Sequence, residues 1–170
     1  METHYINSKN NICDCGTILD QRQDQCNYGI YIYEGIYSYY AQAFRPTLST
    51  LAEIRLGMWK IGDPNDYNLT LSIRKTLDGV DIVSKSISGS VVTSNSEWIS
   101  FEFEIIDLTP GETYYMVLGG DGGNQGACYL WCCYAGDEDR YPYGKSWDNS
   151  FMGQWTITYI QGYPFFDFCF

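Results

Sequence analysis

Seven cysteines are the residues of this 170-residue chain that could do the most chemistry. They form an N-terminal and a C-terminal group: Cys13, Cys15, Cys26, Cys128, Cys132, Cys133 and Cys169. Cysteines at this density are unusual in a reducing cytosol, so the composition predicts disulfides and an oxidising, extracellular compartment. Because the groups lie far apart, we expect bridges that close loops of ~100 residues, where loop-closure entropy is largest. The odd number leaves one thiol free or paired with another molecule.

Two other roles for the cysteines stay open, which are zinc ligation and simple burial of the thiols. A zinc site could combine Cys13 and Cys15 with residues of the second group, Cys128, Cys132 and Cys133. Neither group has the two-residue gap between ligands that is typical of zinc knuckles and ribbons, and this favours disulfides.

Catalytic residues are scarce in this chain. The only histidine is His4, so Ser-His-Asp or Cys-His triads and His-ligated metal centres are disfavoured. Glu102 and Glu104 are spaced like the carboxylate pair of a jelly-roll glycosidase, but they also fit the solvent-facing side of a strand. Gly144-Lys145-Ser146 and the glycine-rich loop 119–126 each lack a glycine that the corresponding nucleotide-binding motif requires. We therefore predict that the protein is not an enzyme.

An acidic loop is the one candidate for a metal cofactor. It contains Asp137, Glu138 and Asp139, whose carboxylates could bind Ca²⁺ together with backbone carbonyl groups. EF-hand spacing is absent, because Tyr141 and Pro142 stand where a ligand and the glycine should be. A solvated charge cluster explains the same residues, so no cofactor is expected beyond this calcium candidate.

Aromatic residues suggest a second kind of site. Trp and Tyr rings can stack on the apolar faces of sugar rings. Five such residues cluster in the sequence among polar groups: Trp131, Tyr134, Tyr141, Tyr143 and Trp147. They predict a platform for a polysaccharide or glycan, with burial of several of them in the core as the alternative.

The C-terminal residues form an alternating aromatic segment that contains Phe165, Phe166, Phe168 and Phe170. Four phenylalanines in water would forfeit ~1.5–3 kcal/mol each relative to burial. They therefore either complete a sheet of their own chain or pair with the exposed sheet edge of a second copy.

Charge and hydropathy restrict the partners and the location of the protein. The formal net charge of −11 comes from 10 basic and 21 acidic residues, and it disfavours nucleic acid and anionic membranes as partners. No stretch approaches ~20 consecutive apolar residues, so no membrane span is expected. Asn68 begins a glycosylation sequon, which is compatible with an extracellular surface. The first residues lack an apolar signal peptide, so we expect an export signal to have been removed or to lie outside this chain.

Strands must position these candidates, because the chain shows period-two alternation and no helical pattern. In the clearest run, 98–105, one face carries Ile99, Phe101, Phe103 and Ile105. Similar runs lie near 28–33, 37–44, 53–58, 69–74, 114–118 and 155–159. Turns rich in Gly, Pro, Asn and Asp separate them. This pattern predicts an all-β protein, an antiparallel β-sandwich or jelly roll of about nine or ten strands. We expect a cysteine-bearing leader, 1–27, packed on a single domain, 28–170.

The segment 41–51, which begins Ala41-Gln42-Ala43-Phe44-Arg45-Pro46, resembles the opening of a broad group of archaeal and bacterial extracellular jelly-roll modules. The likeness continues through 62–64, 69–73, 98–103 and 108–115, and it covers roughly residues 37–160. Those modules resemble carbohydrate-binding domains and are often appended to surface proteins. Because the shared motifs mark strand ends and turns, the resemblance implies a fold rather than a chemical site.

These observations predict a non-catalytic extracellular structural subunit. It would associate with copies of itself into a cell-surface filament, appendage or layer through terminal-strand contacts and disulfides, as the odd thiol and the apolar C-terminus suggest. The alternative is a carbohydrate-binding or adhesion module that uses exposed Trp and Tyr residues.

Overall fold

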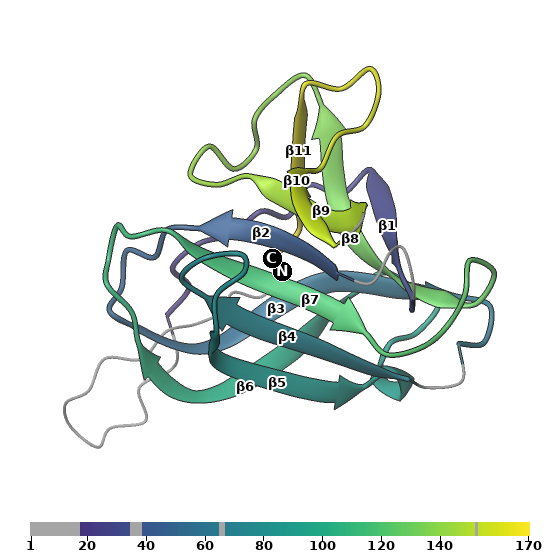
Figure 1. The fold of residues 1–170 in the computed structure, drawn as a ribbon, viewed down its shortest axis with the longest axis horizontal. Coiled ribbons are helices and arrows are strands. Elements are labelled where there is room, and N and C mark those ends of the chain that lie inside the picture. The colour runs from purple at the N-terminus through teal and green to yellow at the C-terminus, as the bar shows by residue number, and fades with distance from the viewer. Residues whose placement is uncertain (1–17, 35–38, 65–66, 152) are drawn as a thin grey trace.

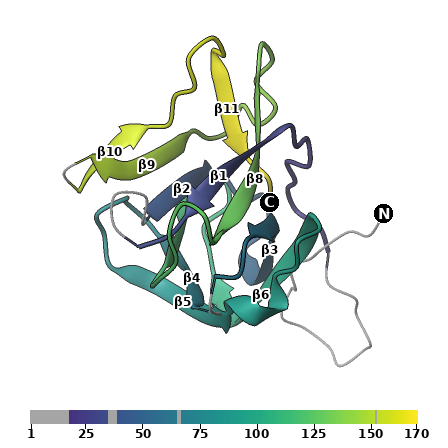
Figure 2. The same ribbon diagram turned by 90° about the vertical axis from the view of Figure 1, so that its right-hand side faces the viewer.

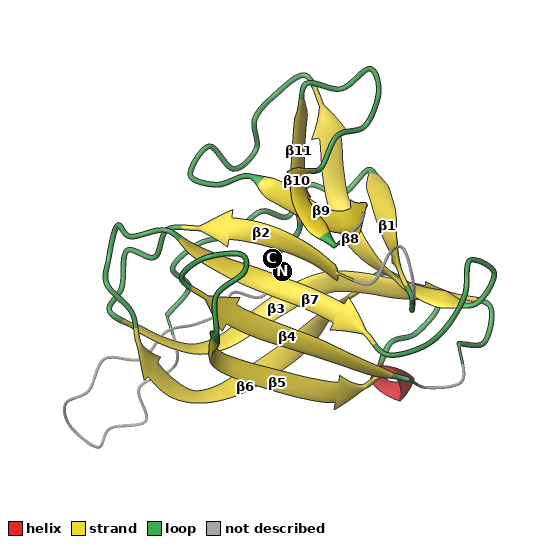
Figure 3. Ribbon diagram, in the orientation of Figure 1, coloured by secondary structure: helices red, strands yellow, loops and turns green. Residues whose placement is uncertain are grey.

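The computed structural model describes residues 18–34, 39–64, 67–151 and 153–170. It confirms the all-β prediction, with two antiparallel sheets packed together (Figure 1). The strands are β1 Tyr28–Ile32, β2 Tyr39–Phe44, β3 Thr50–Ile61, β4 Asn68–Arg74, β5 Asp81–Ser88, β6 Glu97–Asp107, β7 Tyr114–Gly120, β8 Cys128–Gly136, β9 Ser146–Phe151, β10 Gln154–Ile157 and β11 Phe165–Phe168. The single helical turn in the described residues is η1, Gly89–Val91 (Figure 3).

The described residues form eleven strands rather than the nine or ten predicted. Two of the eleven strands show little apolar alternation. They are β5 and β9, in which serines, aspartates and other polar residues break up the apolar positions. Both pair with a neighbouring hairpin strand, and the strand pairing itself holds them in the sheet.

The first eight strands have the connectivity of a jelly roll. One sheet has the order β1-β8-β3-β6, with β11 also paired to β8, and the other has the order β10-β9-β2-β7-β4-β5. From β1 to β8 the chain changes sheet at every connection except the β4–β5 hairpin, as in double-sheet jelly rolls. Figure 2 shows the two layers from the side.

Alternating apolar residues fill the space between the sheets, as the sequence predicts. Leu69, Leu71 and Ile73 of β4 are completely buried there. On β6 the alternation holds for Ile99 and Phe101 but not for Ile105, which is exposed. The pairing of β3 with β6 is irregular between Leu51 and Glu53, and Leu51 lies opposite Ile106. Such a bulge changes which face a residue points to, so Ile106 packs on the core in place of Ile105.

The C-terminal aromatic segment completes a sheet of its own chain. Strand β11 pairs with the second half of β8, from Phe165 opposite Gly136 to Phe168 opposite Cys133. Phe166 and Phe168 are buried in the core, and Phe170 packs against it. Of the two alternatives for this segment, the structure therefore shows the one in which it completes a sheet of its own chain, and contact of the terminal strand with a second copy stays a prediction.

The described part of the leader lies against the C-terminus. The backbone N–H of Gln23 donates to the carbonyl of Phe170, and the N–H of Phe170 donates back to Gln23, each at 3.0 Å. The Asn27 side chain extends β1 by bonding both the N–H and the carbonyl of Ala135. Cys13 and Cys15, like His4, lie outside the described residues.

Candidate functional site

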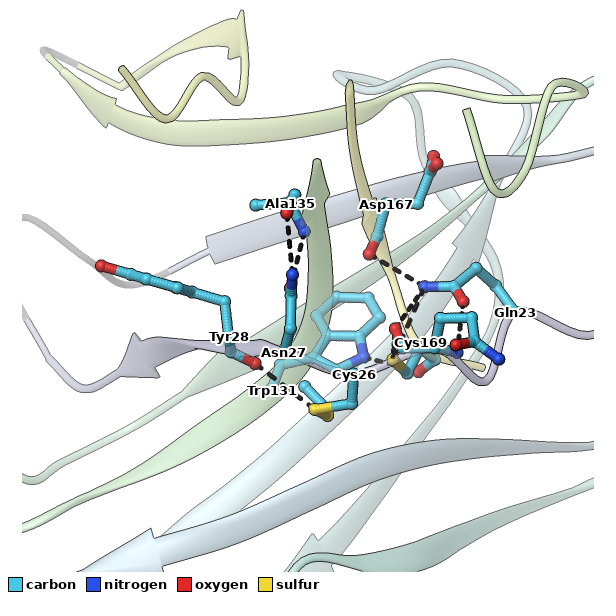
Figure 4. Close-up of a disulfide and its surroundings, with 10 residues drawn as sticks. Gln23, Cys26, Asn27, Tyr28, Trp131, Ala135, Asp167 and Cys169 are labelled. Atoms are coloured by element: carbon cyan, nitrogen blue, oxygen red, sulfur yellow. Dashed lines mark hydrogen bonds between the residues drawn. A yellow bond between two sulfur atoms is a disulfide. The ribbon is translucent and has the colours of Figure 1, made fainter. Parts of the chain in front are cut away.

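Three of the predicted cysteines meet on the outer face of the sheet that contains β8. Cys26 and Cys132 form a disulfide, and the Sγ atoms of Cys26, Cys132 and Cys169 all lie within 4.8 Å of one another (Figure 4). Because Trp131 and Cys133 point into the core, Cys132 between them points outward. The bridge joins residues 106 positions apart, so the prediction of a disulfide across a long loop is confirmed.

Neighbouring strands hold the two buried sulfurs side by side. Cys169 follows β11 directly, and its N–H donates to the carbonyl of Cys132 at 2.8 Å. Gly57 of β3 lies beside both, and a Cβ at this position would be 3.1 Å from the Cβ of Cys132 and 3.3 Å from that of Cys169. The absence of a side chain at Gly57 therefore makes room for the cluster.

A small pocket opens beside the cluster. Its volume is about 140 Å³, and besides Gly57 and the three cysteines it is lined by Asp24, Ser96, Glu97 and Trp98. Cys26 is exposed, whereas Cys132 and Cys169 are buried. Solvent therefore reaches the cluster from the Cys26 side, past acidic and aromatic side chains.

The environment of Cys169 keeps its sulfur protonated. Burial raises the pKa of this thiol to about 12, and the amide of Gln23, with Nε2 3.6 Å from the Sγ atom, opposes that shift. The thiol donates a hydrogen bond to the carbonyl of Gln25 at 3.1 Å. The site thus combines a disulfide with a third thiol inside reacting distance, and thiol–disulfide exchange is the chemistry it can perform.

The zinc alternative is wrong for Cys132 and Cys133. Consecutive residues of a strand point to opposite faces, so these two sulfurs cannot ligate the same ion. Cys128 and Cys133 are free and buried, as the third alternative expected. Burial raises the pKa of Cys128 to about 11 and that of Cys133 further.

The predicted sugar platform is wrong for Trp131 and Tyr141. Trp131 has no exposed surface, stacks on Phe168 with the ring centroids 4.0 Å apart, and donates its indole N–H to the carbonyl of Cys169. Tyr141 is 4% exposed and packs edge-on against Phe170. Alternate residues of a strand share one face, so Trp131 lies on the core side of β8 together with Tyr129 and Cys133.

The other platform candidates lie at the surface but do not form one patch with these two. Tyr143 is 61% exposed. Tyr134 is half-buried, with the guanidinium of Arg140 4.9 Å from its ring centroid. Trp147 is half-buried on β9 and pairs in register with Ala41 of β2.

The residues of the calcium and glycosylation candidates are exposed or half-buried. Asp137, Glu138 and Asp139 form no three-carboxylate site, because the cysteine cluster is the one group of three ligand atoms close enough for a single ion within the described ranges. Glu138 instead pairs with Arg140 at 2.8 Å. Asn68 is exposed at the start of β4, where its side chain donates to Asp121.

Sequence reasoning missed two residues of the cluster, Gly57 and Gln23. Gly57 lies in the interior of the long strand β3, and a glycine in a strand interior is a signal for close approach of a neighbour. Gln23 carries no comparable signal, because it lies in a polar segment and becomes buried only when the C-terminus packs beside it.

No protein family matches the chain, and no curated protein sequence matches it. Among the described residues, no helix has the length and apolar character needed to cross a membrane.

Proposed function

We propose that this protein is a non-catalytic, extracellular structural subunit that associates with copies of itself. The observation that supports this proposal is a pair of uncharged edge strands. In the described part of the chain, β1 pairs only with β8, and β10 pairs only with β9. An edge strand of this kind is a template for pairing with another chain.

The opposite edges of both sheets are protected by charge. Strand β5 carries Asp81 and Lys85, and β6 carries several acidic residues. Neither β1 nor β10 contains a charged residue or a proline. Tyr31 of β1 is 40% exposed and Ile157 of β10 is 54% exposed. Association through β1 and β10 would cover these side chains, whereas charges disfavour pairing at β5 and β6.

Two further observations support the extracellular part of the proposal. The Cys26–Cys132 disulfide is typical of an oxidising compartment. The resemblance of segment 41–51 to surface modules of archaea and bacteria points to the same location. The proposed contact uses β1 and β10 rather than the C-terminal strand, because β11 contains Asp167 whereas β1 and β10 contain no charged residue.

We expect Tyr31→Lys combined with Thr156→Lys to abolish self-association of the full chain. Each substitution places a charge on an uncharged edge strand, where pairing with a second chain would bury it. Sedimentation velocity over a range of concentrations measures the effect, and we expect association at least tenfold weaker than in the unsubstituted protein.

Ser84→Lys is the matched control, because it adds a charge to the exposed edge strand β5. It should leave association unchanged. An unsubstituted chain that stays monomeric up to millimolar concentration would contradict the proposal.

Carbohydrate binding is the second candidate function, and one observation favours it. On the outer face of the larger sheet, Trp147, Ala41, Val117 and Ser72 lie side by side in register across four strands. Ala41, Val117 and Ser72 are almost completely buried, so the half-buried indole of Trp147 is the ring in this row on which a sugar could stack.

We expect Trp147→Ala to weaken retention on an immobilised polysaccharide at least tenfold if this face binds sugars. Trp98→Ala is the matched control, because Trp98 is an exposed tryptophan on the other sheet. Affinity electrophoresis against a broad panel of polysaccharides measures the effect. Absence of retardation of the unsubstituted protein across the panel would exclude this candidate.

A further inference from the structure

We infer that Cys26, Cys132 and Cys169 form an internal thiol–disulfide exchange site that exposes Cys26 for attachment of a low-molecular-weight disulfide. The inference concerns the chemistry of the cluster and does not depend on self-association. It rests on three sulfurs within 4.8 Å, of which two are bonded and one is free.

The exchange begins at Cys169. Its thiol loses a proton to hydroxide from the solvent, which forms water, and the resulting thiolate attacks Sγ of Cys132. A bond forms between Cys169 and Cys132 while the Cys26–Cys132 bond breaks, and the electron pair of the broken bond leaves on Sγ of Cys26. One disulfide is made and one is lost, so this step needs no oxidant or reductant.

Attack at Cys132 is favoured over attack at Cys26 for two reasons, the position of the new disulfide and the exposure of the leaving thiolate. Cys132 and Cys169 lie on adjacent strands and are already joined by a backbone hydrogen bond of 2.8 Å. Directly opposite residues of antiparallel strands have Cα atoms about 4.5–5.5 Å apart, within the range that a disulfide spans. The leaving thiolate is then the exposed Cys26, which water can solvate, rather than the buried Cys132.

The second step occurs at the exposed sulfur. The Cys26 thiolate attacks one sulfur of an external disulfide, forms a mixed disulfide with it, and releases the other half as a thiolate. The co-reactant is thus a small disulfide that can enter a pocket of about 140 Å³. Asp24 and Glu97 line this pocket, so a cationic disulfide fits it better than an anionic one.

The charged groups around the cluster set the pH dependence of the exchange. Burial is the largest cause that raises the pKa of Cys169, the Gln23 amide lowers this pKa, and Asp167 on β11 raises it. Asp24 is paired with Arg22, and Glu97 lines the same pocket. With a pKa of about 12, the thiolate fraction of Cys169 rises about tenfold for each pH unit below that value, and the reaction rate should follow it.

Incubation of the full, oxidised chain with cystamine at pH 7, 8 and 9 tests this inference. After quenching in acid, peptide mass mapping identifies which cysteine carries the cysteamine adduct and which cysteines are bonded. We expect an adduct on Cys26 together with a Cys132–Cys169 peptide, formed about tenfold faster with each pH unit. Mapping by peptide keeps adducts on Cys13 or Cys15 separate from the adduct on Cys26.

Two variants complete the test. Cys169→Ala should leave Cys26 unmodified and the Cys26–Cys132 peptide intact, and Cys169→Ser provides the same test with a side chain of closer size. Cys128→Ala removes a buried free thiol that lies on β8, like Cys132, but outside the cluster. This variant should react with cystamine like the original chain. The inference is overturned by an adduct on Cys169 with the Cys26–Cys132 bond intact, by no adduct on Cys26, or by equal Cys26 modification in the Cys169 variants.

Discussion

Removal of the Cys26–Cys132 bridge is expected to lower the free energy of unfolding by about 4.7 kcal/mol, the chain-entropy value for a loop on the order of 100 residues. The bridge joins residues 106 positions apart. Without it, the unfolded chain gains the freedom to separate its N-terminal segment from β8.

The measurement must prevent Cys169 from replacing the lost partner. We therefore compare Cys26→Ala/Cys169→Ala with Cys169→Ala alone, by urea unfolding under oxidising conditions. In the reference variant only the Cys26–Cys132 bond can form within the cluster, so the difference between the two free energies of unfolding isolates that bond.

Reduction provides the control for this comparison. In excess dithiothreitol both variants lack the bond, and the difference between their free energies of unfolding should collapse to the small effect of one exposed side chain. A difference under oxidising conditions no larger than the one under reduction would mean that the bridge does not constrain the unfolded chain.

Asp167→Asn is expected to stabilise the protein at neutral pH by about 2–3 kcal/mol. Asp167 is 3% exposed, and burial raises the pKa of its carboxyl from an ordinary value of 3.8 to about 6, with Asp139 adding to the shift. The backbone N–H of Tyr141 donates to this carboxyl at 3.1 Å and opposes the shift. An asparagine keeps an oxygen acceptor for that N–H and carries no charge.

The sign of the pH dependence follows from proton binding. Between pH 4 and 6 the folded protein holds a proton on Asp167 that the unfolded chain has lost, so stability falls as pH rises through this window. The stabilisation is fully present below the ordinary pKa of 3.8 and is lost above about 6. The difference between these pKa values corresponds to about 3 kcal/mol.

Unfolding curves of both proteins from pH 4 to 8 check this prediction. The gain from Asp167→Asn should appear between pH 4 and 6 and stay constant above 6. Asp137→Asn, which neutralises an exposed aspartate of the neighbouring loop, should show no such gain. Parallel curves for Asp167→Asn and the original chain across the window would contradict the assigned pKa.

Local pattern was sufficient to predict the strands that bury one face. Residues such as Leu69, Leu71 and Ile73 alternate with polar neighbours, and period-two alternation means the same thing wherever the strand lies. Strands that lack this pattern, such as β9, could not be predicted, because pairing with neighbouring strands holds them in place. The exposure of Ile105 could not be predicted either, because it follows from the irregular pairing between β3 and β6, which depends on both strands.

For the cysteines and the aromatic residues, too, one part of the outcome could be predicted from the sequence and the other part depended on the tertiary structure. Their number and positions along the chain were enough to predict a long-range disulfide, because loop entropy and redox chemistry depend on composition and sequence separation. Which sulfurs meet depended on β8, β11 and the leader packing side by side, so Cys169 joined Cys26 and Cys132 while Cys133 turned into the core. Trp131 could equally have faced a sugar or the core, and only the pairing of β11 with β8 placed Phe168 against its ring. Composition and periodicity are local properties that the chain carries before it folds, whereas the neighbours of a side chain exist only once distant strands have paired.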